Sequence, residues 1–293
     1  MQYLLVVTIS LYIISISNAQ TLNSLTSLSK LIDTVPNSTT NNINIIQNTS
    51  DGENIKICYM PYLASFSRDG EAINNNEVYE GLASVALAME HLNTGNGTII
   101  QELDGINERC PLQFYTYSFD SMGQETVSVN TALEITDPHN IDNEELVPCA
   151  FLSATGSPIA IMTSVITDIK QIPHISALAT SSILDHPGYK YFGRTIPNDR
   201  ATAIPLLQKL RDWNVNHLGI LNINDVYGND FADAIRDASA GPDFDTVAVN
   251  INIDFTPEGI ERAIRQLKNT KFTYFFAIIP GRVLDDLMSE AYK

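Results

Sequence analysis

Small hydroxyl-bearing residues gather at two places in the chain, each directly after a short apolar run. The first cluster, residues 153–157, ends at Ser157 and is followed by Pro158, and the second spans residues 177–181. Proline is favoured at the first position of a helix, where an amide hydrogen would have no partner within the helix. We therefore expect Ser157 at the N-cap of a helix that begins at Pro158, where free backbone amides attract a carboxylate or similar anion.

The segments around both clusters alternate between strand and helix patterns. In the first half, strands are expected at 56–63, 112–119, 149–152, 173–177 and 191–196, with helices at 76–92, 124–135 and 158–170. In the second half, helices are expected at 201–213, 230–238, 257–268 and from 282 onward, with strands at 218–223, 245–253 and 272–279. This alternation predicts an α/β protein with parallel, doubly wound sheets.

A doubly wound sheet with strand order 2-1-3-4-5 binds ligands beyond the carboxyl ends of its strands, where the order reverses between strands one and three. The loops at 64–69 and 153–157 would lie there, with the loop at 177–181 beside them. Both hydroxyl clusters are therefore predicted at the mouth of one ligand site. Arg68 lies in the same mouth, either as a partner for a ligand carboxylate or as a solvated loop residue.

Four motifs carry a resemblance to a known family. They are SATGSPIAIM at 153–162, IPHISALATS at 172–181, YKYFGRTIPND at 189–199 and DVYG at 225–228. In order and spacing they resemble the extracellular ligand-binding domain of class C G-protein-coupled receptors, natriuretic-peptide-type receptor guanylate cyclases and bacterial amino-acid-binding proteins. The likeness is strongest to metabotropic glutamate receptors and covers the chain from about residue 55 to its end.

The resemblance implies a two-lobed clamshell of the type I periplasmic-binding-protein-like fold, in which each lobe is a doubly wound parallel sheet. Lobe 1 would span 55–197 and lobe 2 would span 198–293. Since chains of this family cross back to complete both lobes, lobe 2 is expected to be incomplete and any transmembrane region to lie outside this sequence. A homodimer or heterodimer through lobe 1 is a further expectation.

The resemblance also identifies four ligand-binding residues. Ser157 and Thr180 match the positions that hold the α-carboxylate in amino-acid-binding relatives. Asp199 matches the position that meets the amino group, and Tyr227 matches an aromatic residue of lobe 2. The simpler alternative is that Asp199 only caps the helix that opens lobe 2 and Thr180 only caps the turn after strand four.

These matches imply the ligand-binding module of a cell-surface receptor, on the extracellular face of the plasma membrane, that closes on an amino acid or related zwitterion. A free-standing secreted binding protein is the alternative within the same class. Gly156 and Pro158 replace serines that are common in glutamate receptors. The residues that read the ligand's side chain are not identified by the resemblance.

The sequence lacks the common signatures of catalysis, so we expect no enzyme, no cofactor and no metal site. It contains no Gly-X-Ser-X-Gly elbow, no phosphate-binding loop that ends in Lys-Ser/Thr and no His-Glu-X-X-His pair. The other class considered is a secreted hydrolase that uses Ser157 or Ser181 with His174 and Asp199. The net charge of −17 argues against nucleic acid or an anionic membrane surface as a partner, because both require clustered Lys and Arg.

The N-terminus has the pattern of a secretory signal peptide. Residues 4–16 are apolar but too few to span a bilayer comfortably, and the small residues at 17–19 predict cleavage after Ala19. A buried N-terminal strand or an uncleaved anchor is the alternative. Residues 20–54 are rich in Asn, Ser and Thr, which predicts a flexible leader. Glycosylation sequons begin at Asn37, Asn48 and Asn96.

The chain has three cysteines, an odd number for an oxidising compartment. Cys110 precedes strand two and Cys149 opens strand three, so a structural disulfide between them is the favoured expectation. The two strands flank strand one and are separated by roughly 9 to 10 Å, so the loop before Cys110 would have to bring the residues closer. Cys58, inside strand one, would then be a small buried thiol, and a bridge to Cys58 is the alternative.

Overall fold

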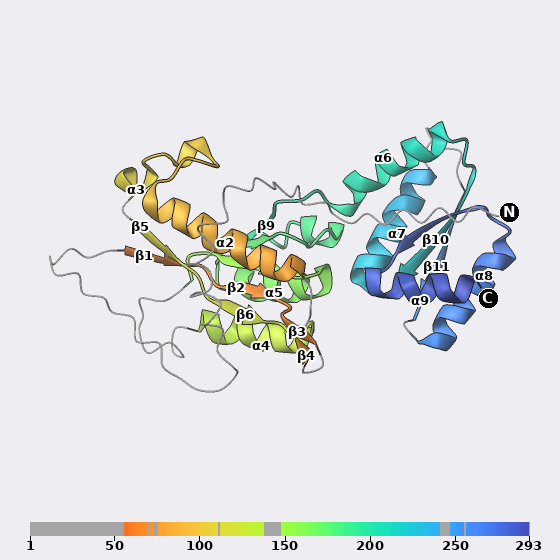
Figure 1. Cartoon of the computed structure of the whole chain (residues 1–293), viewed down its shortest axis with the longest axis horizontal. Helices are drawn as coiled ribbons and strands as arrows, with labels where there is room; N and C mark the ends of the chain where they lie inside the picture. Colours follow the sequence, from red (N-terminus) through yellow and green to blue (C-terminus); the bar gives the residue numbers. More distant parts are fainter. Residues whose placement is uncertain are drawn as a thin grey trace. The chain divides into compact units, whose positions relative to one another are not determined.

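The computed structural model describes residues 56–68, 71–72, 76–110, 112–137, 148–240, 247–254 and 256–292 (Figure 1). The described residues fall into two compact units. One is formed by residues within 12–154 and 166–175, and the other by residues within 155–165 and 176–293. The predicted signal peptide, the leader, Asn37 and Asn48 lie outside the described residues.

A five-stranded sheet carries the first half of the chain. It consists of β2 (Tyr62–Ala64), β6 (Ser118–Asp120), β7 (Phe151–Ala154), β8 (His174–Ser176) and β9 (Phe192–Arg194). Their order in the sheet is β6-β2-β7-β8-β9, and β2 pairs in parallel with both β6 and β7. This is the predicted order 2-1-3-4-5, with the reversal between β2 and β7. Helices α2 (Asn76–Thr94), α4 (Glu125–Thr136) and α5 (Ser157–Ile169) connect the strands.

The two strands predicted at 56–63 and 112–119 are each divided in two. β1 (Lys56–Tyr59) precedes β2, β5 (Leu112–Tyr115) precedes β6, and β1 pairs in parallel with β5. Pro61 explains the first division, because proline has no amide hydrogen to donate to a neighbouring strand. The two segments stay side by side across the break, because Met60 N donates to Tyr115 O and Tyr62 N donates to Tyr117 O, both at 2.8 Å.

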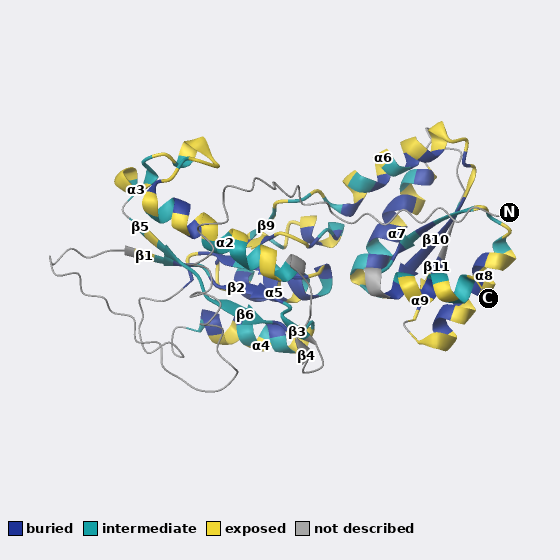
Figure 2. Cartoon of the chain, in the orientation of Figure 1, coloured by how far each residue is buried: buried dark blue, intermediate teal, exposed yellow. Residues whose placement is uncertain are grey.

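A three-stranded parallel sheet forms the second half of the chain, with β10 (His217–Ile223) between β11 (Val247–Ile253) and β12 (Tyr274–Ile278). Helices α6 (Asp199–Asp212) and α7 (Val226–Ser239) pack on one apolar cluster with Ile220 and Phe276 of the sheet. Helices α8 (Pro257–Thr270) and α9 (Gly281–Ala291) pack on a second cluster with Leu221 and Ile251. Both faces of the sheet are therefore covered, which explains the apolar runs in its strands (Figure 2). The predicted doubly wound α/β fold is confirmed.

Several short elements were not predicted from the sequence. An antiparallel pair, β3 (Ser67–Arg68) with β4 (Glu71–Ala72), follows β2. A 3-10 turn η2 (Gln101–Leu103) and helix α3 (Ile106–Arg109) follow α2, and a second 3-10 turn, η4 (Ser182–Asp185), follows β8. None of the helices in the described ranges combines the length and apolar character that crossing a membrane requires.

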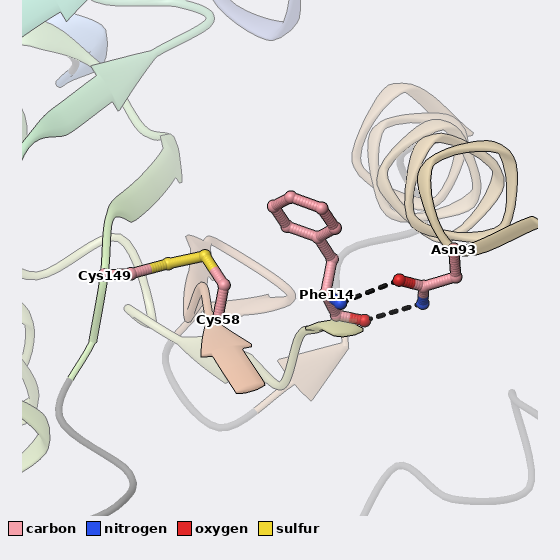
Figure 3. The surroundings of a disulfide bond; sticks show 4 residues. All are labelled: Cys58, Asn93, Phe114 and Cys149. Atoms are coloured by element: carbon pink, nitrogen blue, oxygen red, sulfur yellow. Dashed lines mark hydrogen bonds between the residues drawn. A yellow bond between two sulfur atoms is a disulfide. The ribbon is translucent and has the colours of Figure 1, made fainter. Parts of the chain in front are cut away.

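The disulfide joins Cys58 to Cys149, with their Cα atoms 5.5 Å apart (Figure 3). The predicted pairing of Cys110 with Cys149 is therefore wrong, and Cys110 is a partly exposed free thiol. Strand one is the reason. Cys149 N donates to Tyr59 O at 2.9 Å, so the segment before β7 lies directly beside β1. Neighbouring strands are about 4.8 Å apart, within disulfide reach, whereas a bridge from Cys110 would have to cross β1.

On the opposite side of β1, its neighbour β5 is tied to helix α2. Cys58 pairs in register with Phe114 of β5. The side-chain amide of Asn93, on α2, donates to Phe114 O at 2.8 Å and accepts from Phe114 N at 2.7 Å (Figure 3). The disulfide and this pair of hydrogen bonds therefore hold strands β1 and β5 from both sides.

Candidate ligand-binding site

Ser157 joins the two hydroxyl clusters instead of capping its own helix. The carbonyl of Gly156 accepts the first helical hydrogen bond of α5, from Ala160 N at 3.0 Å, so Gly156 occupies the N-cap position that was expected for Ser157. The buried Ser157 Oγ accepts hydrogen bonds from Thr180 N at 3.2 Å and Ser181 N at 3.1 Å. A hydroxyl that accepts two hydrogen bonds still has its own hydrogen to donate.

Thr180 and Asp199 are linked through their backbones, while their side chains keep unused polar atoms. Asp199 N donates to Thr180 O at 2.9 Å. Thr180 Oγ1 and Asp199 Oδ2 are both buried and have no hydrogen-bond partner among the described residues. Asp199 is only 2% exposed. Buried polar atoms are nearly always hydrogen-bonded in native proteins, so these two atoms are candidates for contact with a bound molecule.

The alternative explanation was that Asp199 and Thr180 only cap the elements that follow them, but neighbouring residues perform this capping. Asn198 is the N-cap of α6, and its Oδ1 accepts a 2.8 Å hydrogen bond from an amide of the first turn. Ser181 is the N-cap of η4, and its Oγ accepts an amide hydrogen bond of 3.2 Å. The side chains of Asp199 and Thr180 are therefore not required to cap these elements.

Burial raises the pKa of Asp199 to about 7. A polar interaction with the Thr180 side chain, outside normal hydrogen-bond geometry, lowers this pKa, the Asp230 carboxylate raises it and the Arg194 guanidinium lowers it. Near neutral pH, Asp199 therefore exists in both its neutral and its ionised form.

Arg194 fixes the loop that carries Thr180. Its guanidinium donates to Ala179 O at 3.2 Å and to Ser181 O at 2.9 Å, and it forms an ion pair with Asp185. The other oxygen of the Asp185 carboxylate accepts a 2.6 Å hydrogen bond from the Asn198 side chain. The loop is therefore held at both ends by side chains of the 189–199 motif, and sequence reasoning had not assigned Arg194 or Asn198 to the site.

Tyr227 lies in the first turn of α7, whose N-cap is Asp225. Asp225 Oδ1 accepts a 2.8 Å hydrogen bond from Gly228 N, which starts the helix at Val226, four residues earlier than predicted. Burial, with contributions from the nearby charges of Asp199 and Asp225, raises the pKa of Tyr227 to about 12. The phenol therefore keeps its proton at neutral pH and can donate it in a hydrogen bond.

Asp230, one turn further along α7, contacts the same loop. Its Oδ2 accepts from Ser182 N at 2.5 Å and its Oδ1 accepts from Ser182 Oγ at 2.9 Å. Sequence reasoning had not assigned Asp230 to the site. Hydrogen bonds thus join Ser157, Thr180 and Asp199 into one group, and Tyr227 and Asp230 lie close enough to Asp199 for electrostatic interaction.

Two further residues were candidates, Arg68 for ligand binding and Asn96 for glycosylation. The Arg68 side chain lies outside the described residues. Asn96 is exposed on the turn after α2, where its Oδ1 accepts a 2.9 Å hydrogen bond from Thr98 N. Within the described ranges, no three His, Cys, Asp or Glu side chains are grouped so that they could hold a metal ion.

His174 makes a contact that differs from the one required by the hydrolase alternative. Its Nε2 is 2.7 Å from Ser153 Oγ, its ring packs edge-on against Phe151, and it is fully buried. Burial lowers its pKa to about 3. A neutral, enclosed imidazole bonded to Ser153 is a structural group rather than a base that serves Ser157 or Ser181.

Comparison with known proteins identifies a matching family and several similar receptors. The family model described as "Receptor family ligand binding region" matches residues 82–293. Similar curated proteins are the extracellular calcium-sensing receptors of Sus scrofa, Bos taurus and Homo sapiens, each 23% identical over 195 residues. Each match covers 60% of this chain but only 17% of the relative's own length.

Proposed function

Because the chain belongs to the family of receptor ligand-binding regions, we propose that it binds a small zwitterion, in the first place an amino acid, at the group formed by Ser157, Thr180, Asp199 and Tyr227. The observation that carries this proposal is the combination of a buried carboxylate oxygen without a partner and a hydroxyl without a partner on residues whose backbones are hydrogen-bonded to each other.

The hydroxyl side of the group suits a carboxylate. Ser157 Oγ accepts two amide hydrogens and so directs its own hydrogen elsewhere, and the Thr180 hydroxyl also has its one hydrogen to donate. Ser157 is also the first residue of α5, and the partial positive charge of a helix start stabilises an anion.

The carboxylate side of the group suits an ammonium ion. Asp199 Oδ2 is the available acceptor, and a hydrogen bond between two charged groups is roughly twice as strong as one between neutral groups. Tyr227 adds an aromatic ring and a protonated phenol near the same carboxylate. A ligand that carries both charges would satisfy both sides at once.

At the level of the whole protein, we propose an extracellular ligand-binding module of a cell-surface receptor. The relatives are named extracellular calcium-sensing receptors, and a receptor that senses an extracellular signal supports this location. The alternative is a free-standing secreted binding protein, and a full-length transcript with or without a transmembrane region distinguishes the two. A signal peptide at 1–19, glycan on Asn96, a lobe boundary after residue 197 and pairing through lobe 1 remain part of the proposal.

The test is isothermal titration calorimetry of the full chain against glycine, L-glutamate, L-lysine and L-phenylalanine. Phenethylamine and 3-phenylpropionate each lack one charge of phenylalanine, so a zwitterion site should bind both more weakly than the amino acid. Thr180→Ala should weaken binding about five- to thirtyfold, by loss of one hydrogen bond, and Asp199→Ala should weaken it further.

Ser84→Ala, an exposed hydroxyl on α2, and Asp212→Ala, an exposed carboxylate on α6, are the matched controls. They should leave the affinity unchanged. If Ser157→Ala, Thr180→Ala and Asp199→Ala all bind as tightly as the parent protein, the ligand lies elsewhere and the proposal is wrong.

A further inference from the structure

A two-point contact between Asp230 and Ser182, which we call the clasp, connects helix α7 to the turn η4. One carboxylate oxygen of Asp230 accepts from Ser182 N at 2.5 Å, and the other accepts from Ser182 Oγ at 2.9 Å. Both oxygens of the carboxylate are thus used as acceptors. Both residues are partly buried, which shields their hydrogen bonds from water.

The clasp joins the two segments that present the proposed ligand contacts. Ser182 is the first residue of η4 and follows Thr180 by two positions, within the loop that Arg194 and Ser157 also hold. Asp230 lies one helical turn after Tyr227 on α7. The clasp therefore fixes the distance between the backbone that carries Thr180 and the helix that carries Tyr227.

We infer that Asp230 is a positioning residue of the ligand site, which holds α7 against the Thr180 loop through Ser182. This inference rests on the proposed function for its effect on ligand binding. The contact between Asp230 and Ser182 does not depend on the proposed function, because neither residue is one of the four proposed ligand contacts.

The pKa of Asp199 provides a second way to detect the effect of Asp230 on the site. Asp230 reaches Asp199 from α7 and raises its pKa, while Arg194 reaches it from β9 and lowers it. Tyr227, also on α7, faces Asp199 as a neutral phenol, and Asp225 acts on that phenol. Removal of the Asp230 charge should therefore lower the pKa of Asp199, whereas a change at Ser182 that leaves this charge in place should not.

Three substitutions separate the geometry of the clasp from its charge. Asp230→Ala removes both hydrogen bonds and the charge. Asp230→Asn keeps the shape and can keep both bonds, because its oxygen accepts from Ser182 N and its amide donates to Ser182 Oγ. Ser182→Ala keeps the charge and loses one bond. Asp233→Ala is the matched control, because Asp233 lies on the same helix with its side chain 52% exposed.

The first measurement needs no ligand. Amide hydrogen exchange of the full chain, followed by mass spectrometry, reports local opening. In Asp230→Ala, exchange should increase in peptides that cover 177–185 and 226–231, while Asp233→Ala and Asp230→Asn should match the parent there. If exchange in Asp230→Ala is unchanged, the clasp does not hold the two segments together, and this conclusion does not depend on what the protein binds.

The second measurement is calorimetry with whichever of the four amino acids binds the parent most tightly. Asp230→Ala should bind about tenfold more weakly and Ser182→Ala about threefold, while Asp230→Asn should stay within about threefold of the parent at high pH. Asp230→Asn should also shift the pH midpoint of binding downward, which a purely structural role would not do.

If exchange increases in Asp230→Ala but its affinity equals that of the parent, the positioning role is refuted. If the parent binds none of the amino acids, the proposed function has failed instead, and the exchange measurement alone decides whether the clasp exists. Should Asp230→Ala fail to fold, Asp230→Asn and Ser182→Ala still give the pH shift and the affinity change.

Discussion

At the scale of single residues, the ionisation of Asp199 should determine what the proposed site can bind. Its pKa is raised from 3.8 to about 7, mainly by burial. An ammonium ion is attracted only to the ionised form, so a proton and the ligand compete for the same carboxylate. In the ligand-free protein, the native state retains this proton over a pH range in which the unfolded chain has lost it. The Asp199 contribution to stability therefore decreases as pH rises from about 4 to 7.

Ligand affinity is predicted to rise with pH as Asp199 ionises. Between about pH 5.5 and 7, the dissociation constant should fall by up to tenfold per pH unit, and it should level off above about pH 8. Calorimetry in a series of buffers measures this. Asp199→Asn should abolish the rise as well as weaken binding. A parent profile that stays flat over this range would mean that no ammonium meets Asp199.

Sequence reasoning proposed Ser157, Thr180, Asp199 and Tyr227 as ligand contacts, which stays a prediction, but it misread the local role of Ser157. Ser157 was expected to cap α5, yet its oxygen binds the amides of Thr180 and Ser181. Asp230 and Ser182 were missed, because their contact joins segments that are distant in the chain and no local pattern marks it. Periodicity and capping rules describe neighbours in sequence, whereas these contacts depend on how the elements pack.

At the scale of elements, the start of α7 depends on the glycine of the DVYG motif. A Cβ atom on Gly228 would collide with the carbonyl oxygen of Ile223, at the end of β10. Gly228 N is also the donor to the Asp225 cap. The motif therefore lets the helix begin immediately after the strand, which sets the position of Tyr227.

Gly228→Ala is predicted to destabilise the protein by about 1–3 kcal/mol, the range for overpacking a closely packed site. It should also weaken amino-acid binding, because the added methyl group would displace the start of α7 and with it Tyr227. Urea unfolding and calorimetry measure the two effects. Ala238→Gly, later in the same helix, is the comparison: it should cost about 1 kcal/mol through helix propensity and leave ligand affinity unchanged. Equal affinities for the parent and Gly228→Ala would contradict the argument.

Element boundaries were predictable to within a few residues wherever the apolar pattern was strong. The helix predicted at 257–268 is α8 at Pro257–Thr270, and the strand predicted at 218–223 is β10 at His217–Ile223. The division of strand one at Pro61 was not predicted, although the proline that causes it is visible in the sequence. An apolar run continues across Pro61, and only the missing hydrogen-bond donor interrupts it.

At the scale of the whole molecule, the strand order explains both the confirmed and the incorrect predictions. The order 2-1-3-4-5 and the likeness to class C receptor ligand-binding regions are confirmed. The same order places strand one between strands two and three, and so Cys58 becomes the partner of Cys149. Because strand one separates Cys110 from Cys149, the predicted pairing of these two residues is wrong.

Loss of the disulfide is predicted to destabilise the chain substantially. Cys58 and Cys149 are 91 residues apart in sequence, and loops of that length give a stabilisation of roughly 3–5 kcal/mol in the chain-entropy model. Cys58→Ser should lose about this much in urea unfolding, while Cys110→Ser should change stability by less than about 0.5 kcal/mol. Peptide mapping without reduction should recover Cys58 linked to Cys149. A mapped bridge to Cys110 would contradict the structure.

The division of labour around the Thr180 loop has an evolutionary consequence. Arg194, Asn198 and Asp185 hold the loop, whereas the buried atoms without a partner, which we propose contact the ligand, belong to Thr180 and Asp199. In a duplicated gene, selection can therefore exchange the side chains of Thr180 and Asp199 while the loop keeps its conformation. Diversification of ligand preference among paralogues would then follow from a few substitutions, with the scaffold inherited intact.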